Sequence, residues 1–248
     1  MPQNPAHLLL NIGNTHIQTA LNEAGGPRLL DTCDTSHALV LGQIPFLEQM
    51  PTMWTGTAVC VVPQLRALLA KRYPALHFLT TSDYPQLDFT RVDASTLGMD
   101  RVANAAAALH IAGGAAMVID FGTCIHTVVV QADGGFLGGA IMPGRILQRK
   151  ALATYTAQLP LLPLRDEPAS PIGSNTLDAL AAGVDLGIVG AVRELLAATR
   201  RQLGGECLVL PTGGDAPFFL RALPELHPSP ELLTLRGVAL AASIKSNG

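Results

Sequence analysis

One pattern occurs twice in this chain and constrains its fold more than any other feature: an apolar strand, a turn with glycine and threonine, and a second strand. Residues 8–21 read LLLNIGNTHIQTAL, and residues 116–130 read AMVIDFGTCIHTVVV. In both stretches an alternating segment follows the turn, which is typical of a β-hairpin. The repetition indicates two α/β halves of related architecture, each with a mixed five-stranded sheet, joined near residues 108–116. We place these halves at 1–112 and 113–248.

The segments around the hairpins alternate between strands and helices. A buried strand at 57–62 runs into a helix with Pro63 in its first turn, where proline is well tolerated. Residues 81–97 contain turn-forming residues, so we expect a loop there. Further elements are predicted as follows: helices at 98–113, 145–158 and 176–202, a strand at 77–80, a flexible Pro-rich connection at 159–173, a strand running into a Gly-rich turn at 207–216, and a strand or turn followed by a helix at 232–245.

Composition argues against several classes of protein. The apolar fraction of 48% allows a substantial core, and the net charge of −3 argues against nucleic acid as a partner. No apolar run is long enough to span a membrane, and the N-terminal residues MPQNPAH do not resemble a signal peptide. The four cysteines show no CxxC pairing, which indicates reduced thiols and a cytoplasmic protein rather than a disulfide framework or a zinc site.

Two polar turns suit a phosphate ligand. Gly13, Asn14 and Thr15 would bring backbone N–H groups, an amide and a hydroxyl to one point. In the second hairpin, the carboxylate of Asp120 could hold a cation while Thr123 bonds a phosphate. Each turn also has a simpler interpretation, because glycine and aspartate are common in ordinary hairpin turns.

Three other motifs have the same double interpretation. In LGMDR, residues 97–101, Asp100 stands at a helix start, where it is either functional or stabilised by the helix dipole alone. In PTGGDA, residues 211–216, a nucleotide could approach the backbone of a Gly-rich turn. In GSNT, residues 173–176, helix capping explains one polar residue but not why three of them gather.

The order of these motifs carries more information than any one of them. NIGNT, GMDR, DFGT, GGAIMPG, GSNT and TGGDA follow one another across the chain, and VCVVP and TAQLP accompany them. Over roughly residues 8 to 242, this arrangement resembles the type III pantothenate kinases. That family belongs to the sugar kinase, actin and heat-shock ATPase superfamily. The resemblance therefore implies two ribonuclease-H-like halves with ATP in a central cleft, and a homodimer with acceptor sites near its interface.

The resemblance also implies a role for each matching position. Asp100 would be the base that takes the proton from the attacking hydroxyl, and Asp120 would bind a monovalent cation, K⁺ or NH₄⁺. ATP and its phosphates would be contacted by Gly13, Asn14, Thr15, Gly122, Thr123, Gly213 and Gly214, and the pantothenate by Gly98, Arg101 and Thr176. The reaction would be the ATP- and Mg²⁺-dependent phosphorylation of pantothenate to 4′-phosphopantothenate, the first step of coenzyme A biosynthesis.

The sequence departs from the family pattern where the phosphates and metal are expected. Asn11 stands where the family has aspartate, and Gln18 where it usually has lysine. In the second motif, Cys124, His126 and Val128 replace alanine, threonine and aspartate. Replacing a metal-facing carboxylate with an amide keeps an oxygen ligand but removes a charge, so weaker magnesium binding is expected.

Two alternatives remain open beside the pantothenate kinase. The chain could be a catalytically weakened or inactive relative that binds ligands or regulates a partner, or a kinase for a different small hydroxyl acceptor. Fold alone does not separate these alternatives. The departures at the phosphate and metal positions do, because a kinase must find other metal ligands and an inactive relative need not.

Overall fold

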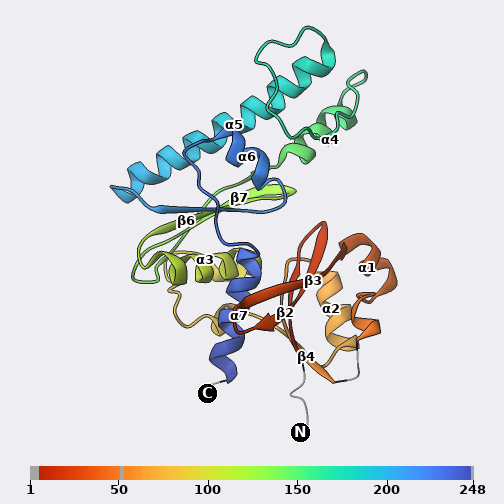
Figure 1. Ribbon diagram of the computed structural model, residues 1–248, viewed down its shortest axis with the longest axis vertical. Helices are drawn as coiled ribbons and strands as arrows, with labels where there is room; N and C mark the ends of the chain where they lie inside the picture. Colours follow the sequence, from red (N-terminus) through yellow and green to blue (C-terminus); the bar gives the residue numbers. More distant parts are fainter. Residues whose placement is uncertain (1–5, 51–52, 247–248) are drawn as a thin grey trace. The chain divides into compact units, whose positions relative to one another are not determined.

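Each hairpin lies in a separate five-stranded sheet of the computed structural model, which describes residues 6–50 and 53–246 (Figure 1). The chain forms two units. The first contains the described residues up to Gly113, residues 133–137, and those from Pro230 onward; the second contains residues 114–132 and 138–229. The predicted α/β class and the pair of mixed five-stranded sheets are confirmed.

The first sheet has the strand order β3-β2-β1-β4-β5, with β1 antiparallel to β2 and parallel to β4. Its helices come from both ends of the chain. The strands and helices of this unit are β1 (Ala6–Ile12), β2 (His16–Glu23), β3 (Gly26–Asp34), α1 (Thr35–Leu41), β4 (Trp54–Cys60), α2 (Pro63–Arg72), β5 (Leu76–Phe78), α3 (Met99–Ala112) and α7 (Leu233–Ser246), with short 3₁₀ turns at Leu47–Gln49, Thr81–Asp83 and Ala94–Thr96.

Alternation along β1 explains why both faces of this sheet are covered. Leu8, Leu10 and Ile12 are fully buried in a cluster with apolar residues of α1 and α2. Leu9 is equally buried, and because side chains alternate across a strand it points to the other face. There α7 packs against β1 and β4, and α3 against β4.

The second sheet has the order β10-β6-β7-β8, with β9 also paired to β7. Here β6 is antiparallel to β7 and parallel to β10. The remaining elements are β6 (Ala116–Phe121), β7 (Cys124–Val130), β8 (Phe136–Gly138), β9 (Ile141–Pro143), α4 (Arg145–Tyr155), α5 (Thr176–Leu203), β10 (Leu208–Thr212) and α6 (Ala216–Ala222). Phe121 of β6 stacks on Phe219 of α6, with ring centroids 4.0 Å apart, and so ties this helix to the sheet.

The two hairpins share one detail of hydrogen bonding. In the first unit, the N–H of Val61, just after β4, donates to the carbonyl of Ile12 at 3.0 Å. In the second unit, the N–H of Asp215, just after β10, donates to the carbonyl of Phe121 at 2.9 Å. Each carbonyl lies immediately before the glycine of its polar turn. The relatedness of the halves that the repeat indicates therefore extends to single backbone bonds.

The observed units differ from the predicted halves in two segments. Residues 133–137 belong with the first unit, where Asp88 bridges to Gly135. The C-terminal helix also belongs there, because α7 packs on α3 (Figure 1) and Thr234 Oγ1 donates to the buried Asn104 Oδ1 at 2.9 Å. A boundary drawn by sequence order misses such long-range packing.

Locally, two segments agree with the predictions and two elements were missed. The stretch 232–245 is a turn followed by a helix, one of its two predicted forms, and α7 begins at its second residue. The edge strand β3 and the short helix α1 were not predicted, because their exposed positions weaken the apolar periodicity. The 81–97 segment is a loop as predicted, with two short 3₁₀ turns. Among the described helices, none is long and apolar enough to cross a membrane.

Packing between α3 and α7 yields a stability prediction. A Cβ atom at Gly237 would collide with the carbonyl oxygen of Ala103, so Gly237→Ala should lower the free energy of unfolding by about 1–3 kcal/mol. Gly190 on α5 has nothing within 4 Å of such an atom, and Gly190→Ala should be neutral or stabilising by about 0.5–1 kcal/mol. Urea denaturation of both variants checks this; an equal effect at the two positions would contradict the packing described.

Candidate active site

The first polar turn is held by α1. The N–H of Gly13 donates to the carbonyl of His16 at 3.0 Å, which closes the turn. Thr35, at the start of α1 and 2% exposed, donates from its hydroxyl to the Gly13 carbonyl at 2.8 Å and from its N–H to the Thr15 carbonyl at 2.9 Å. The side chains of Asn14 and Thr15 remain exposed. The turn is thus fixed from inside and offers polar groups outside, which suits an anionic ligand.

Two departures from the family pattern form a single pair in the structure. Asn11 on β1 and Gln18 on β2 are register partners, and Asn11 Nδ2 donates to Gln18 Oε1 at 3.2 Å. Asn11 Oδ1 is buried and has no hydrogen-bond partner among the described residues. An amide oxygen left over in this way is suited to a metal ion or its water, so the residue present fits a magnesium ligand.

The pairing changes the electrostatic argument made from Asn11 alone. An aspartate and a lysine at these two positions would carry opposite charges, whereas two amides carry none. The formal charge of the pair is therefore zero either way, and the loss of the carboxylate is offset by the loss of the ammonium group. What differs is the local field at the ligand oxygen, which is weaker for an amide than for a carboxylate.

The acceptor motif lies at the start of α3. Gly98 is the N-cap residue, and Asp100 Oδ1 accepts from the Arg101 N–H at 2.7 Å. A Cβ atom at Gly98 would lie 2.6 Å from that oxygen, so only glycine leaves the carboxylate this position. Burial lowers the pKa of the Arg101 guanidinium, an effect that the charge of Asp100 opposes. The helix start explains part of this arrangement, and a half-buried carboxylate next to a half-buried arginine is also suited to proton transfer.

In the second unit, three predicted motifs meet at one point. Gly213, with φ of +94°, packs so closely that a Cβ atom there would collide with Asp120 Oδ1. Gly144, at the N-cap of α4, would likewise collide with the Gly122 carbonyl, and its N–H donates to the Thr123 carbonyl at 2.9 Å. The DFGT, MPG and TGGD turns are therefore in backbone contact, and Gly213 and Gly214 are exposed there.

The departures in the second hairpin are of two kinds. His126 is the register partner of Asp120, and its Nε2 lies 3.7 Å from Asp120 Oδ2. Val128 is 1% exposed and pairs with Val118, so it is a core residue deeper in the sheet. Within the described residues no group of three or more His, Cys, Asp or Glu side chains is arranged to hold a metal ion.

In the polar cluster before α5, two residues cap the helix and a third does not take part in the capping. Asn175 is the N-cap and accepts from the Asp178 N–H at 3.0 Å, while Ser174 and Asn175 both donate to the Asp178 carboxylate. Thr176 is not needed for this capping. It lines an open pocket of about 430 Å³ together with apolar residues of α4 and α5. A second pocket, of about 530 Å³, lies against α3 and α7 in the first unit and is lined by none of the predicted site residues.

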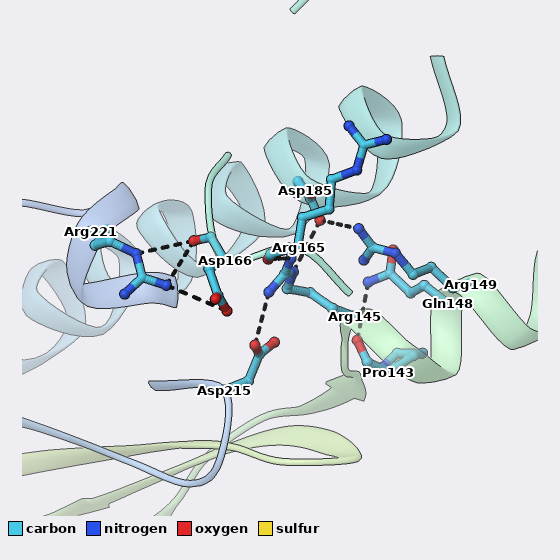
Figure 2. Close-up of polar contacts among 9 residues, drawn as sticks. All are labelled: Pro143, Arg145, Gln148, Arg149, Arg165, Asp166, Asp185, Asp215 and Arg221. Carbon is cyan, nitrogen blue, oxygen red and sulfur yellow. Dashed lines mark hydrogen bonds and ion pairs between the residues drawn. The ribbon is translucent and has the colours of Figure 1, made fainter. Parts of the chain in front are cut away.

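Sequence reasoning missed one buried group in the second unit. Arg145 and Arg149 of α4 are 1% and 2% exposed, and both donate to Asp185 of α5 (Figure 2). Arginine on a helix usually lies at the surface, so nothing in the local pattern indicated this burial. The usable signal was Asp185, a charged residue on the apolar face of a long helix.

The architecture is that of actin-like ATPases and sugar kinases. A crystal structure of a conserved Campylobacter jejuni protein assigned to the Baf family has a TM-score of 0.66 at 22% identity and covers 97% of this chain and 100% of that one. MreB5 of Spiroplasma citri bound to ADP has a TM-score of 0.52 at 12% identity and covers 99% of this chain and 97% of that one. At these identities the likeness shows the fold alone.

Sequence comparison identifies the family within this class. The type III pantothenate kinase model matches residues 7–198, and the chain belongs to that family. The type III pantothenate kinase of Parafrankia sp. (strain EAN1pec) is 37% identical over 195 residues, which cover 75% of this chain and 76% of that one. The enzyme of that name from Acidothermus cellulolyticus is 32% identical over 250 residues, which cover 94% and 96%.

The amide pair yields a prediction for magnesium. Asn11→Asp adds one negative charge at the unpartnered oxygen, so the magnesium concentration needed for half-maximal ATP binding should fall about tenfold. Asn22→Asp adds the same charge on β2, at the end of that strand away from the polar turn, and serves as the control, with no expected change. Magnesium titrations of ATP binding for both variants test this. If Asn11→Asp and the parent protein show the same magnesium dependence, Asn11 is not a magnesium ligand.

Proposed function

We propose that this protein transfers the γ-phosphoryl group of ATP to pantothenate and forms 4′-phosphopantothenate, the first step of coenzyme A biosynthesis. The observation that carries the proposal is family membership: the family model spans residues 7–198, and one curated relative of that activity aligns with 94% of the chain. A chain with these features would work on small molecules in the cytoplasm.

On the acceptor side, Asp100 would take the proton from the primary hydroxyl of pantothenate as the new O–P bond forms. Its carboxylate is held at the start of α3, where Oδ1 accepts a hydrogen bond from the Arg101 N–H. Gly98, Arg101 and Thr176 would bind pantothenate. Thr176 lines an open pocket of the second unit.

On the nucleotide side, the exposed turn at Gly13–Thr15 would bind ATP phosphates, and so would Gly122 and Thr123. The Gly213–Gly214 turn would lie near the nucleotide. Magnesium, when bound, neutralises the charge that develops on the phosphate oxygens during transfer. Asn11 would hold this ion or its water through the unpartnered Oδ1. Asp120 would be the monovalent-cation position, with His126 Nε2 3.7 Å from its carboxylate.

A second function has its own supporting observation. The uncharged Asn11–Gln18 pair is compatible with a relative that binds nucleotide or pantothenate without catalysis, because binding needs less charge stabilisation than phosphoryl transfer does. A kinase acting on another small hydroxyl compound is the other alternative. Incubation of the purified protein with ATP, magnesium and pantothenate, followed by mass spectrometry, separates pantothenate phosphorylation from both alternatives. Phosphopantothenate supports the proposal; nucleotide binding without any phosphorylated product would contradict it.

Asp100 provides the mechanistic prediction. Asp100→Asn keeps the shape of the side chain but removes the base, so turnover should fall about 10²–10⁴-fold. ATP binding should change little, because the residue is assigned to the acceptor. Initial rates and nucleotide titrations on the same preparation test both parts. A variant with an unaltered rate would exclude Asp100 as the base.

Assembly is a further prediction. We expect a homodimer whose interface is built largely by the second half, including the helix after Pro143, α4. The family resemblance and the aliphatic content of the helices motivate this expectation. Apolar side chains are also exposed in this half, namely Leu177 on α5 and Leu161 and Ile172 in the Pro-rich segment before it. Light scattering at micromolar concentration should give twice the chain mass of 26.0 kDa. A mass of one chain would contradict it.

A further inference from the structure

Arg145 is the centre of a buried polar cluster that the proposed function does not use. Its side chain is 1% exposed and reaches three separate segments of the second unit (Figure 2). Nε donates to Asp185 Oδ1 at 3.0 Å, Nη1 to Asp215 Oδ1 at 2.8 Å, and Nη2 to the carbonyl of Arg165 at 2.6 Å. The guanidinium carbon lies 3.4 Å from the ring centroid of Phe218, a cation–π contact.

The second arginine of α4 shows what is particular to Arg145. Arg149 lies one turn later, is 2% exposed and donates to the same oxygen of Asp185 at 2.8 Å. Its side chain and that of Arg145 balance the charges of Asp185 and Asp215, which burial alone would make unfavourable. In Figure 2, however, only Arg145 reaches down to Asp215. Both arginines lie on α4 and are equally buried, but only Arg145 bonds to Asp215 at the end of the Gly-rich turn.

Asp215 connects this cluster to the nucleotide-side turn. It directly follows Gly213 and Gly214, and its N–H donates to the Phe121 carbonyl at 2.9 Å. The backbone of the turn is thus tied to β6, while its side-chain end is tied to Arg145. Burial raises the pKa of the Asp215 carboxyl, and Arg145 opposes this rise and favours the charged form. Both exposed glycines lie between these attachments and β10.

The third acceptor lies in the Pro-rich segment 159–173. Arg145 holds the carbonyl of Arg165, and Arg221 of α6 donates to the next carbonyl, that of Asp166, from Nε at 3.0 Å and Nη2 at 2.7 Å (Figure 2). A segment without helix or strand is held here by two arginines from different helices. One side chain thereby joins this segment to the glycine turn.

We propose that Arg145 is a positioning residue for the nucleotide: by holding Asp215, it keeps the Gly213–Gly214 backbone in the conformation that accepts ATP. This inference rests on the proposed function, because it assigns that turn to the nucleotide. Glycines lose more conformational freedom on ordering than other residues, so a paired glycine turn needs an outside attachment to be preformed. A charged hydrogen bond from a buried arginine supplies that attachment.

The test compares three variants with the parent protein. Arg145→Met removes the attachment, Arg149→Met removes an equally buried arginine of the same helix that does not contact Asp215, and Asp215→Ala removes the attachment while leaving the Arg145–Asp185 pair. Hydrogen exchange of a peptide covering 212–216 reports on the turn. Calorimetric titration with MgATP reports on binding, with the folded fraction matched by circular dichroism.

We expect Arg145→Met and Asp215→Ala to exchange faster at 212–216 and to bind MgATP about tenfold more weakly. Arg149→Met should match the parent protein in both measurements. Equal effects of the Arg145 and Arg149 variants would overturn the inference, because they would indicate general loss of stability. If Arg145→Met does not fold, Asp215→Ala decides: unchanged exchange and binding in that variant would overturn it too. A parent protein that binds no MgATP would reject the proposed function and the inference with it.

Discussion

The structure depends on one constraint, applied once in each unit: the first strand of a hairpin also pairs in parallel with a later strand. β1 does this with β4, and β6 with β10. Parallel strands end at the same edge of a sheet, so the polar turn after the first strand and the loop after the later one become neighbours. In each unit one backbone hydrogen bond joins the loop to the strand before the turn: the N–H of Val61 donates to the Ile12 carbonyl, and that of Asp215 to the Phe121 carbonyl. Two of the proposed site residues lie beside these loops. A Cβ atom built on Gly98 would lie 3.7 Å from Val61 Cγ1, and one built on Gly213 would collide with Asp120 Oδ1.

On this shared framework the chain carries an unusual pair of side chains. The Asn11–Gln18 amides take positions where the family has a carboxylate and usually a lysine, and they bond to each other across the hairpin. A double replacement that keeps the formal charge at zero disturbs the surrounding core less than either replacement alone, because neither amide requires a counter-ion. The pair therefore explains how the fold tolerates Asn11. The effect of Asn11 on catalysis then depends on how strongly its amide oxygen binds the metal ion.

The sequence was informative where the determinants are local. Alternation and turn chemistry predicted both hairpins, and Pro63 marked the start of α2. The observed units differ from the predicted halves in two segments, and both differences come from contacts between residues far apart in sequence: α7 packs with α3, where Thr234 bonds to Asn104, and residues 133–137 join the first unit. The Asn11–Gln18 partnership was accessible in principle, because a turn at 13–15 sets the register that places 11 opposite 18. For Arg145 the sequence holds only an indirect signal, the charged Asp185 on the apolar face of α5, since its acceptors come from segments 20, 40 and 70 residues away.

The central claim is transfer of the γ-phosphoryl group of ATP to pantothenate, and one labelling measurement tests it. The protein is incubated with magnesium, pantothenate and ATP labelled with ¹⁸O in the γ-phosphoryl group, and the mass of the pantothenate product is followed with time. The account predicts that the labelled phosphoryl group appears on pantothenate with its three labelled oxygens retained. Labelled inorganic phosphate without labelled phosphopantothenate, from a protein that binds MgATP and pantothenate, would contradict it.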